Sequence, residues 1–396
     1  MIKTILGRNR GTNVTTTVRL TISFNFGYQL SFRAEGQVRT KWSHLAVLML
    51  NPDELYEVPN PVKEGAFEVS NRLPSSDRVY FRIESHDKGS RRAHVPLNNI
   101  RKKYFVVGAN PLLCVVAAMG MSVFCQFVLE EKTLDFNDGT WEDLFILSSS
   151  VTGKTLKPVQ IRQGYSTTYK KLGVPLKACT GAPRRMCMRK FHMASKHGIV
   201  NYNFAEASLI HHAIGGESGS GRRIASVATD HYLDNHCLQV SLIAGGWKGG
   251  MKFGAAPHLT TELPADYNSG VLLPWLKTEK VEADRLYRED KCLKGKTYGG
   301  MLEAIDRCLT TFLRAAPFIE EVAGLELQRG IFSHEFFRSE AYHTWKSFML
   351  PEPLPDCLRS AASLEAERSA QFDMSLFDGY DSDFDSAIAA ILNMRE

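Results

Sequence analysis

Residues 144–205 contain no aspartate and no glutamate. Ordinary solvated surfaces mix both signs of charge, so a stretch of this length without an acid is informative. The whole chain has a formal net charge of only +5, and the position of the charge therefore matters more than its sum. The cations of this basic stretch are Lys154, Lys157, Arg162, Lys170, Lys171, Lys177, Arg184, Arg185, Arg189, Lys190 and Lys196.

The cysteines are scattered along the chain and do not form the dense pattern of a disulfide scaffold. There are eight among 396 residues, and a chain of this length does not need a disulfide scaffold. The first residues lack the long apolar core of a secretory signal. These observations favour a cytoplasmic protein with reduced thiols.

The apolar pattern predicts an α+β fold with a β-rich, mostly antiparallel N-terminal half. Apolar residues alternate with polar ones over residues 17–26 and again over residues 78–84, which is the period of a strand. The pattern predicts strands over residues 15–36 and a β-rich domain over residues 1–143. The basic segment, residues 144–205, then contains several Gly and Pro turn signals, which favour loops and short strands.

The second half of the chain is expected to be mixed and then helical, over residues 206–350. Met301, Ile305, Cys308 and Phe312 fall on one helical face, and Pro317 is expected to end or kink that helix. Residues 351–396 form a Pro linker followed by an acidic tail whose end is amphipathic. That tail could dock on basic surface or remain a solubilising extension.

Residues 104–129 carry no charge. Their inner part is long and apolar enough to be a candidate for crossing a membrane. Gly, Asn and Pro interrupt the run and valines favour strands, so a pair of buried strands is the preferred interpretation. Membrane contact through this segment remains the alternative.

The basic stretch indicates binding of nucleic acid. Lysine and arginine that neutralise phosphates release counterions, which gives affinity without sequence preference. Aromatic residues lie among the cations and could stack on unpaired bases, which favours single-stranded RNA or DNA: Tyr165, Tyr169, Phe191, Tyr202 and Phe204. The predicted nucleic-acid-binding residues are Lys170, Lys171, Arg184, Arg185, Arg189, Lys190 and Lys196. The alternative is a charged face that only meets solvent or an acidic surface of the same protein.

Four residues of the same stretch have partial metal-ligand spacing. Cys187, His192 and His197 follow the second half of a zinc-knuckle pattern, but Cys179 precedes Cys187 by too many residues for the first half. We therefore expect no cofactor and keep zinc as an alternative.

The segment Gly216-Glu217-Ser218-Gly219 matches the short nucleophile motif of chymotrypsin-like serine proteases. A histidine and an aspartate precede Ser218 in the required order, as His44 with Asp77 or as His86 with Asp138. A match of four residues rich in Gly and Ser also arises by chance, so a flexible loop is the preferred interpretation.

Taken together, the sequence predicts a protein that binds single-stranded nucleic acid without sequence preference and associates with itself. Such a combination would suit a viral movement, coat or nonstructural protein, by analogy alone. The alternatives are a serine protease centred on Ser218 and a structural assembly protein without nucleic-acid affinity. An enzymatic activity is not favoured.

Overall fold

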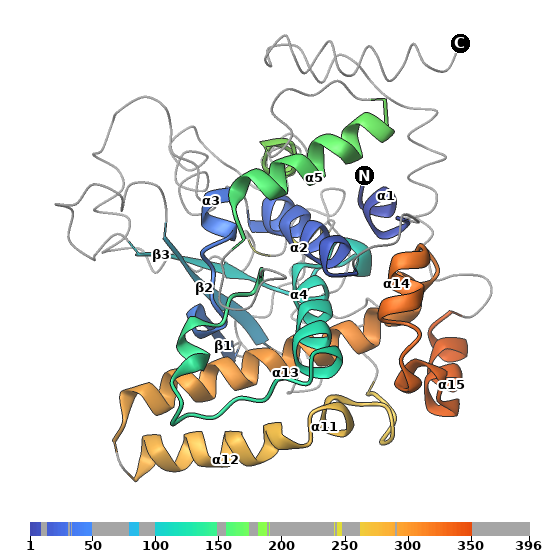
Figure 1. Cartoon of the computed structure of the whole chain (residues 1–396). Coiled ribbons are helices and arrows are strands. Elements are labelled where there is room, and N and C mark those ends of the chain that lie inside the picture. Colours follow the sequence, from blue (N-terminus) through green and yellow to red (C-terminus); the bar gives the residue numbers. More distant parts are fainter. Residues whose placement is uncertain are drawn as a thin grey trace, which may run out of the picture.

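The computed structural model describes residues 1–8, 14–30, 32, 34–49, 79–86, 100–148, 156–173, 181–187, 190, 241, 244–247, 262–289 and 291–350. These residues are mostly helical and include one three-stranded antiparallel sheet (Figure 1). The α-helices are α1 (Ile2–Leu6), α2 (Val14–Leu30), α3 (Ala34–Gln37), α4 (Val115–Val123), α5 (Pro158–Lys171), α11 (Ser269–Leu272), α12 (Trp275–Arg288), α13 (Leu293–Glu320), α14 (Leu325–Gly330) and α15 (Glu340–Met349). The strands are β1 (Leu45–Met49), β2 (Val79–His86) and β3 (Ile100–Phe105). Short 3₁₀ turns are η1 (Trp42–His44), η6 (Pro111–Leu113), η8 (Thr140–Asp143) and η10 (Glu335–Arg338), and η7 (Phe124–Leu129) is a π-helical turn.

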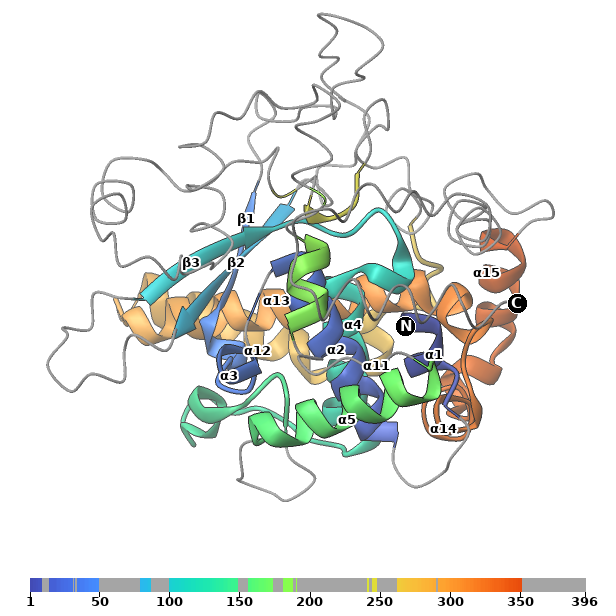
Figure 2. The ribbon, with the colours of Figure 1, turned by 90° about the horizontal axis from the view of Figure 1, so that it is seen from above.

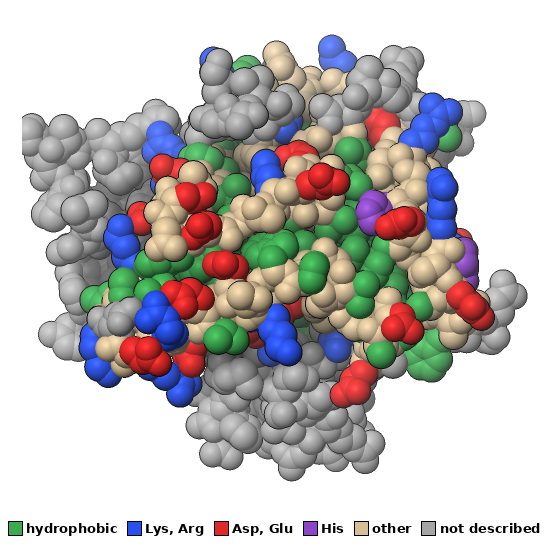
Figure 3. Space-filling view, turned by 60° about the horizontal axis from the view of Figure 1, so that its bottom comes forward, with side chains coloured by type: hydrophobic (Ala, Val, Ile, Leu, Met, Phe, Trp, Pro, Cys, Tyr) green, Lys and Arg blue, Asp and Glu red, His purple; other side chains and the backbone are tan. Residues whose placement is uncertain are grey.

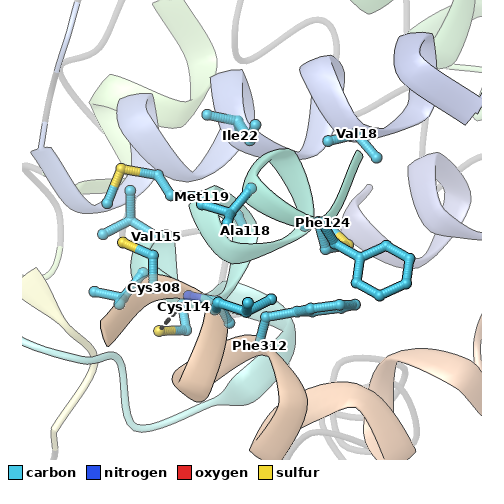
Figure 4. Close-up of a cluster of buried hydrophobic side chains, with 14 of the residues drawn as sticks. Val18, Ile22, Cys114, Val115, Ala118, Met119, Phe124, Cys308 and Phe312 are labelled. Atoms are coloured by element: carbon cyan, nitrogen blue, oxygen red, sulfur yellow. Dashed lines mark hydrogen bonds between the residues drawn. The ribbon is translucent and has the colours of Figure 1, made fainter. Parts of the chain in front are cut away.

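The core of the fold is a stack of helices in which α4 lies between α2 and α13. Figure 4 shows Val18 and Ile22 of α2 on one side of α4 and Cys308 and Phe312 of α13 on the other. Gly120 of α4 permits the closest approach, because a Cβ atom there would lie only 2.1 Å from the carbonyl oxygen of Cys308. Helix α5 covers the far side of α2, and α12 covers α13 (Figure 1).

The predicted β-rich N-terminal half is wrong, because residues 14–30 form the helix α2. Twelve of the 17 residues of α2 are buried, and they include the small polar residues Thr17, Thr21 and Ser23. A helix that is buried on every side has no amphipathic period, so its alternation of apolar and small polar residues mimics a strand. Thr21 Oγ1 donates to the Thr17 carbonyl 2.9 Å away, so its hydroxyl finds a partner within the helix.

The uncharged run over residues 104–129 is also helical beyond Phe105. It supplies η6, α4 and η7, and all nine residues of α4 are buried between neighbouring helices. The buried strands expected here are therefore absent after β3. Among the described residues, no helix has both the length and the apolar character needed to cross a membrane.

The sheet has the order β1-β2-β3, and each neighbouring pair is antiparallel. In its register Leu45 pairs with Ile83, and Phe81 pairs with Phe105, whose rings stack at 5.2 Å. Strand β1 packs against α13, and the sheet lies beside that helix (Figure 2). The strand expected over residues 78–84 is thus confirmed as β2.

The long helix α13 confirms the helical face expected around Met301 and Phe312, both of which are fully buried. Pro317 does not end this helix, which continues to Glu320. Proline cannot donate to the carbonyl four residues earlier, which belongs to Leu313. The Tyr267 hydroxyl donates to that carbonyl at 3.1 Å, so the acceptor left without its helical partner is still satisfied.

Candidate nucleic-acid interface

Helix α5 is the longest described element of the basic stretch, where the sequence favoured loops and short strands. Pro158 occupies its first turn, and the Lys157 N–H donates to Gln160 Oε1 at 2.8 Å. This bond satisfies one of the backbone groups that a helix start leaves open, and proline needs no donor there. Residues 157–160 therefore contain a helix-start signal. The Gly and Pro residues of this stretch had suggested loops instead.

The inner face of α5 is fixed against α2. Gly164 allows the two helices to touch, because a Cβ there would lie 2.4 Å from Leu20 Cδ2. Beside this contact the Tyr165 hydroxyl lies 3.0 Å from Ser23 Oγ, which donates to Gln37 Oε1 at 2.5 Å. Burial raises the pKa of the Tyr165 hydroxyl, so this group stays protonated. The network holds α5 in one orientation and thereby determines which residues face outward.

The outer face of α5 carries cations without acids. Arg162, Lys170 and Lys171 are exposed, as is Lys157 just before the helix. Among the described residues none of these four forms an ion pair, whereas Lys280, Lys346 and Arg307 elsewhere all pair with carboxylates. Lys170 and Lys171 also stand at the C-terminal end of the helix, where positive charge is favourable for the helix dipole.

The aromatic residues of α5 are not available for base stacking. Tyr165 is 1% exposed and Tyr169 is 7% exposed, because both belong to the hydrophobic core, where the Tyr165 hydroxyl meets Ser23 of α2. The expectation that these two rings stack on unpaired bases is wrong, and the other three aromatic residues lie outside the described residues. What α5 offers a ligand is charge together with polar Gln and Thr side chains.

The remaining predicted binding residues have varied environments. Arg184 and Arg185 are partly buried and interact with other parts of the chain. Pro183 packs against Gly27 of α2, which places this short segment beside the C-terminal half of that helix. Arg189 and Lys196 lie outside the described residues.

Lys190 points into the protein. Its Nζ donates to the backbone carbonyls of Tyr28 at 3.4 Å and Ala244 at 2.5 Å, and it lies 3.4 Å from the centroid of the Tyr28 ring. Desolvation lowers the pKa of Lys190 to about 7, and Cys187 acts in the opposite direction. The ammonium caps the Tyr28 carbonyl near the end of α2 and joins it to the Ala244 carbonyl, so its described partners are structural.

The expected alternative of a zinc site cannot be assembled from the described residues. Cys187 is buried, with its Sγ 3.7 Å from the Gln29 carbonyl oxygen, and burial is the usual setting of an inert thiol. Cys179, His192 and His197 lie outside the described residues. Within the part of the chain that the structure describes, no three His, Cys, Asp or Glu side chains gather in a group that could hold a metal ion.

The structure describes only some of the residues that the serine-protease alternative requires. Ser218 and Asp77 lie outside the described residues. His44 Nδ1 accepts the Lys41 backbone N–H at 3.3 Å, whereas in a triad this nitrogen carries the proton that is donated to the aspartate. Asp138, the acid considered with His86, accepts the backbone N–H and the hydroxyl of Thr140, both at 2.8 Å, in the turn before η8.

Exposed Lys157 and Arg162 were part of the basic stretch but were not among the predicted binding residues. The signal that could have identified them is the helical spacing of the buried residues Ile161, Tyr165, Thr168 and Tyr169, which places the cations on the remaining faces.

No model of a known protein family matches this chain, and a comparison with curated proteins gives no match either.

Proposed function

We propose that this protein binds the phosphate backbone of single-stranded nucleic acid, RNA above all, through the outer face of α5. The observation that supports the proposal is the set of four exposed cations, Lys157, Arg162, Lys170 and Lys171, without an ion pair among the described residues. The chain supplies no acid within residues 144–205 to neutralise them.

Phosphate contacts suit this surface better than base contacts. Lysine on a flexible stem acts as a point charge, and arginine adds a fork of donors that can hold a phosphate. With the tyrosines of α5 buried, affinity depends on counterion release, which is insensitive to sequence and sensitive to salt. Binding is therefore expected to weaken steeply as salt increases, and by similar factors for different sequences.

The test is fluorescence anisotropy of labelled single-stranded RNA against the full chain over a salt series. The variant is Lys170→Gln with Lys171→Gln, which removes both charges and keeps polar, unbranched side chains of high helix propensity. Each phosphate contact of a single strand contributes about 0.7 to the slope of log affinity against log salt, so the slope should fall by about 1.4.

The matched control is Lys277→Gln with Lys296→Gln. Both lysines are exposed on α12 and α13, on the side of the molecule away from α5 (Figure 1). This control removes the same net charge and should retain the wild-type slope. Equal slopes for all three proteins, or no binding at low salt, would contradict the proposal.

Self-association remains a separate proposal. An assembly protein without nucleic-acid affinity would form oligomers that dissociate in salt but would leave the anisotropy of RNA unchanged. Sedimentation velocity of the same samples distinguishes this alternative from RNA binding.

A further inference from the structure

An open groove of about 620 Å³ lies on the side of the molecule that carries α11 and η10. Phe127 and Phe336 lie at its base, and the Trp275 ring packs 5.7 Å from that of Phe127. Val271, at the edge, is 52% exposed. Figure 3 shows hydrophobic side chains gathered in the middle of this face, with Asp and Glu side chains around them.

The edge of the groove is acidic. Glu131, Asp266 and Glu335 line it, and all three are exposed and form no ion pair with a described residue. The one lysine in the lining, Lys132, is already paired with Glu130 at 2.6 Å. The net charge of the groove therefore has the opposite sign to that of the chain as a whole.

The backbone at this edge is held in an unusual conformation. Glu131 has a φ of +50°, in the left-handed region that costs a residue with a Cβ atom about 1 kcal/mol or more. This conformation occurs two residues beyond the end of η7, whose π-helical hydrogen bonding is itself a feature found at functional sites. Two local departures from regular helix thus coincide at the groove.

We infer that this groove binds a short peptide segment of a partner protein that carries aliphatic or aromatic side chains flanked by lysine or arginine. The apolar base provides a place for one or two such side chains, which supply most of the affinity in peptide recognition. The unpaired carboxylates at the edge select for flanking cations and oppose acidic segments. This surface is distinct from the outer face of α5, which has the opposite charge.

The experiment is fluorescence anisotropy with a labelled peptide of about ten residues, in which Leu-Trp-Leu is flanked on each side by Lys-Arg pairs. The full chain is compared with Val271→Lys, which adds charge to the apolar edge. We expect affinity to fall about tenfold in this variant, because an apolar contact is lost and the new cation opposes the flanking Lys and Arg of the peptide. Neutralising Asp266 and Glu335 together, as Asp266→Asn with Glu335→Gln, should weaken binding about threefold and reduce its salt dependence.

The matched control is Val281→Lys, an exposed valine of α12 outside the groove. It introduces the same charge on a helix surface and should leave peptide affinity unchanged. A peptide in which Glu replaces each Lys and Arg should bind the wild-type protein much more weakly than the basic peptide, because the carboxylates at the edge oppose its charge. Equal affinity of the basic peptide for the Val271→Lys and Val281→Lys proteins would overturn the inference. Concentration-dependent oligomers that the Val271→Lys substitution abolishes would assign the groove to a second copy of the chain and would also overturn it.

Discussion

Lys190 and Lys171 lie in the same basic stretch but have different environments: the ammonium of one is buried and that of the other is exposed. The Lys171 side chain is exposed on α5, whereas Lys190 places its ammonium on two backbone carbonyls and an aromatic ring. The sequence reports the charge of both residues equally. It does not report which one is enclosed, because that depends on Tyr28 and Ala244, which are distant in the chain.

Burial of Lys190 predicts a characteristic dependence of stability on pH. In the unfolded chain a lysine keeps its proton to about pH 10, whereas the folded protein releases it near pH 7. Unfolding in this window takes up a proton, so the free energy of unfolding rises with pH from about 7 to 10. Lys190→Met removes this contribution.

The measurement is urea unfolding of the wild type and Lys190→Met at pH 7 and pH 9.5. The wild type should gain about 3 kcal/mol relative to the variant between pH 7 and pH 9.5. A difference that is constant with pH would show that the Lys190 pKa is not lowered.

At the level of elements, the sequence predicted the helix α13 but not the helix α2. Helix α13 has one exposed side, so the spacing of Met301, Ile305 and Phe312 identifies it. Helix α2 is buried along most of its length, polar residues included, and so lacks the amphipathic period that distinguishes a helix from a strand. Strand β2 was predictable because its alternation persists, with Phe81 and Ile83 both facing the core.

The packing of α4 on α13 predicts opposite effects for two glycine substitutions. Gly120→Ala should destabilise the protein by about 1–3 kcal/mol, because the added Cβ overlaps the Cys308 carbonyl and the backbone must move. Gly300→Ala, in α13, meets nothing within 4 Å and should stabilise by up to about 1 kcal/mol through helix propensity.

Thermal or urea unfolding of both variants checks the prediction, and the free energy of unfolding should differ in sign between them. Equal effects would mean that α4 and α13 do not approach as closely as described.

At the scale of the whole molecule, the buried apolar side chains of the described residues form one hydrophobic core, which includes residues from Ile2 to Met349. It draws on residues from each of the first three predicted ranges, 1–143, 144–205 and 206–350, while the tail over residues 351–396 lies outside the described residues. The sequence could not reveal that these ranges share one core, because contacts between distant segments such as α4 and α13 leave no local pattern in either of them. The outward cations of α5 were predicted in part, since Lys170 and Lys171 were expected as binding residues and are exposed.

A shared core predicts that the N-terminal part cannot fold alone. A fragment of residues 1–261 lacks α13, and so exposes the apolar faces of α4 and β1 that α13 covers. We expect this fragment to lack a cooperative unfolding transition by circular dichroism, while the full chain unfolds in one step. A fragment that unfolds cooperatively would instead support independent domains divided near residue 205.

The position of α13 late in the chain also has a consequence for biosynthesis. Ribosomes add about 5–20 residues per second, so about 10–30 s pass between the synthesis of Val123 and that of Leu293. During this interval the apolar surface of α4 has emerged before its main partner exists. We therefore expect the nascent chain to complete its folding late in translation, after a period in which the apolar surface of α4 is open to aggregation or to chaperones.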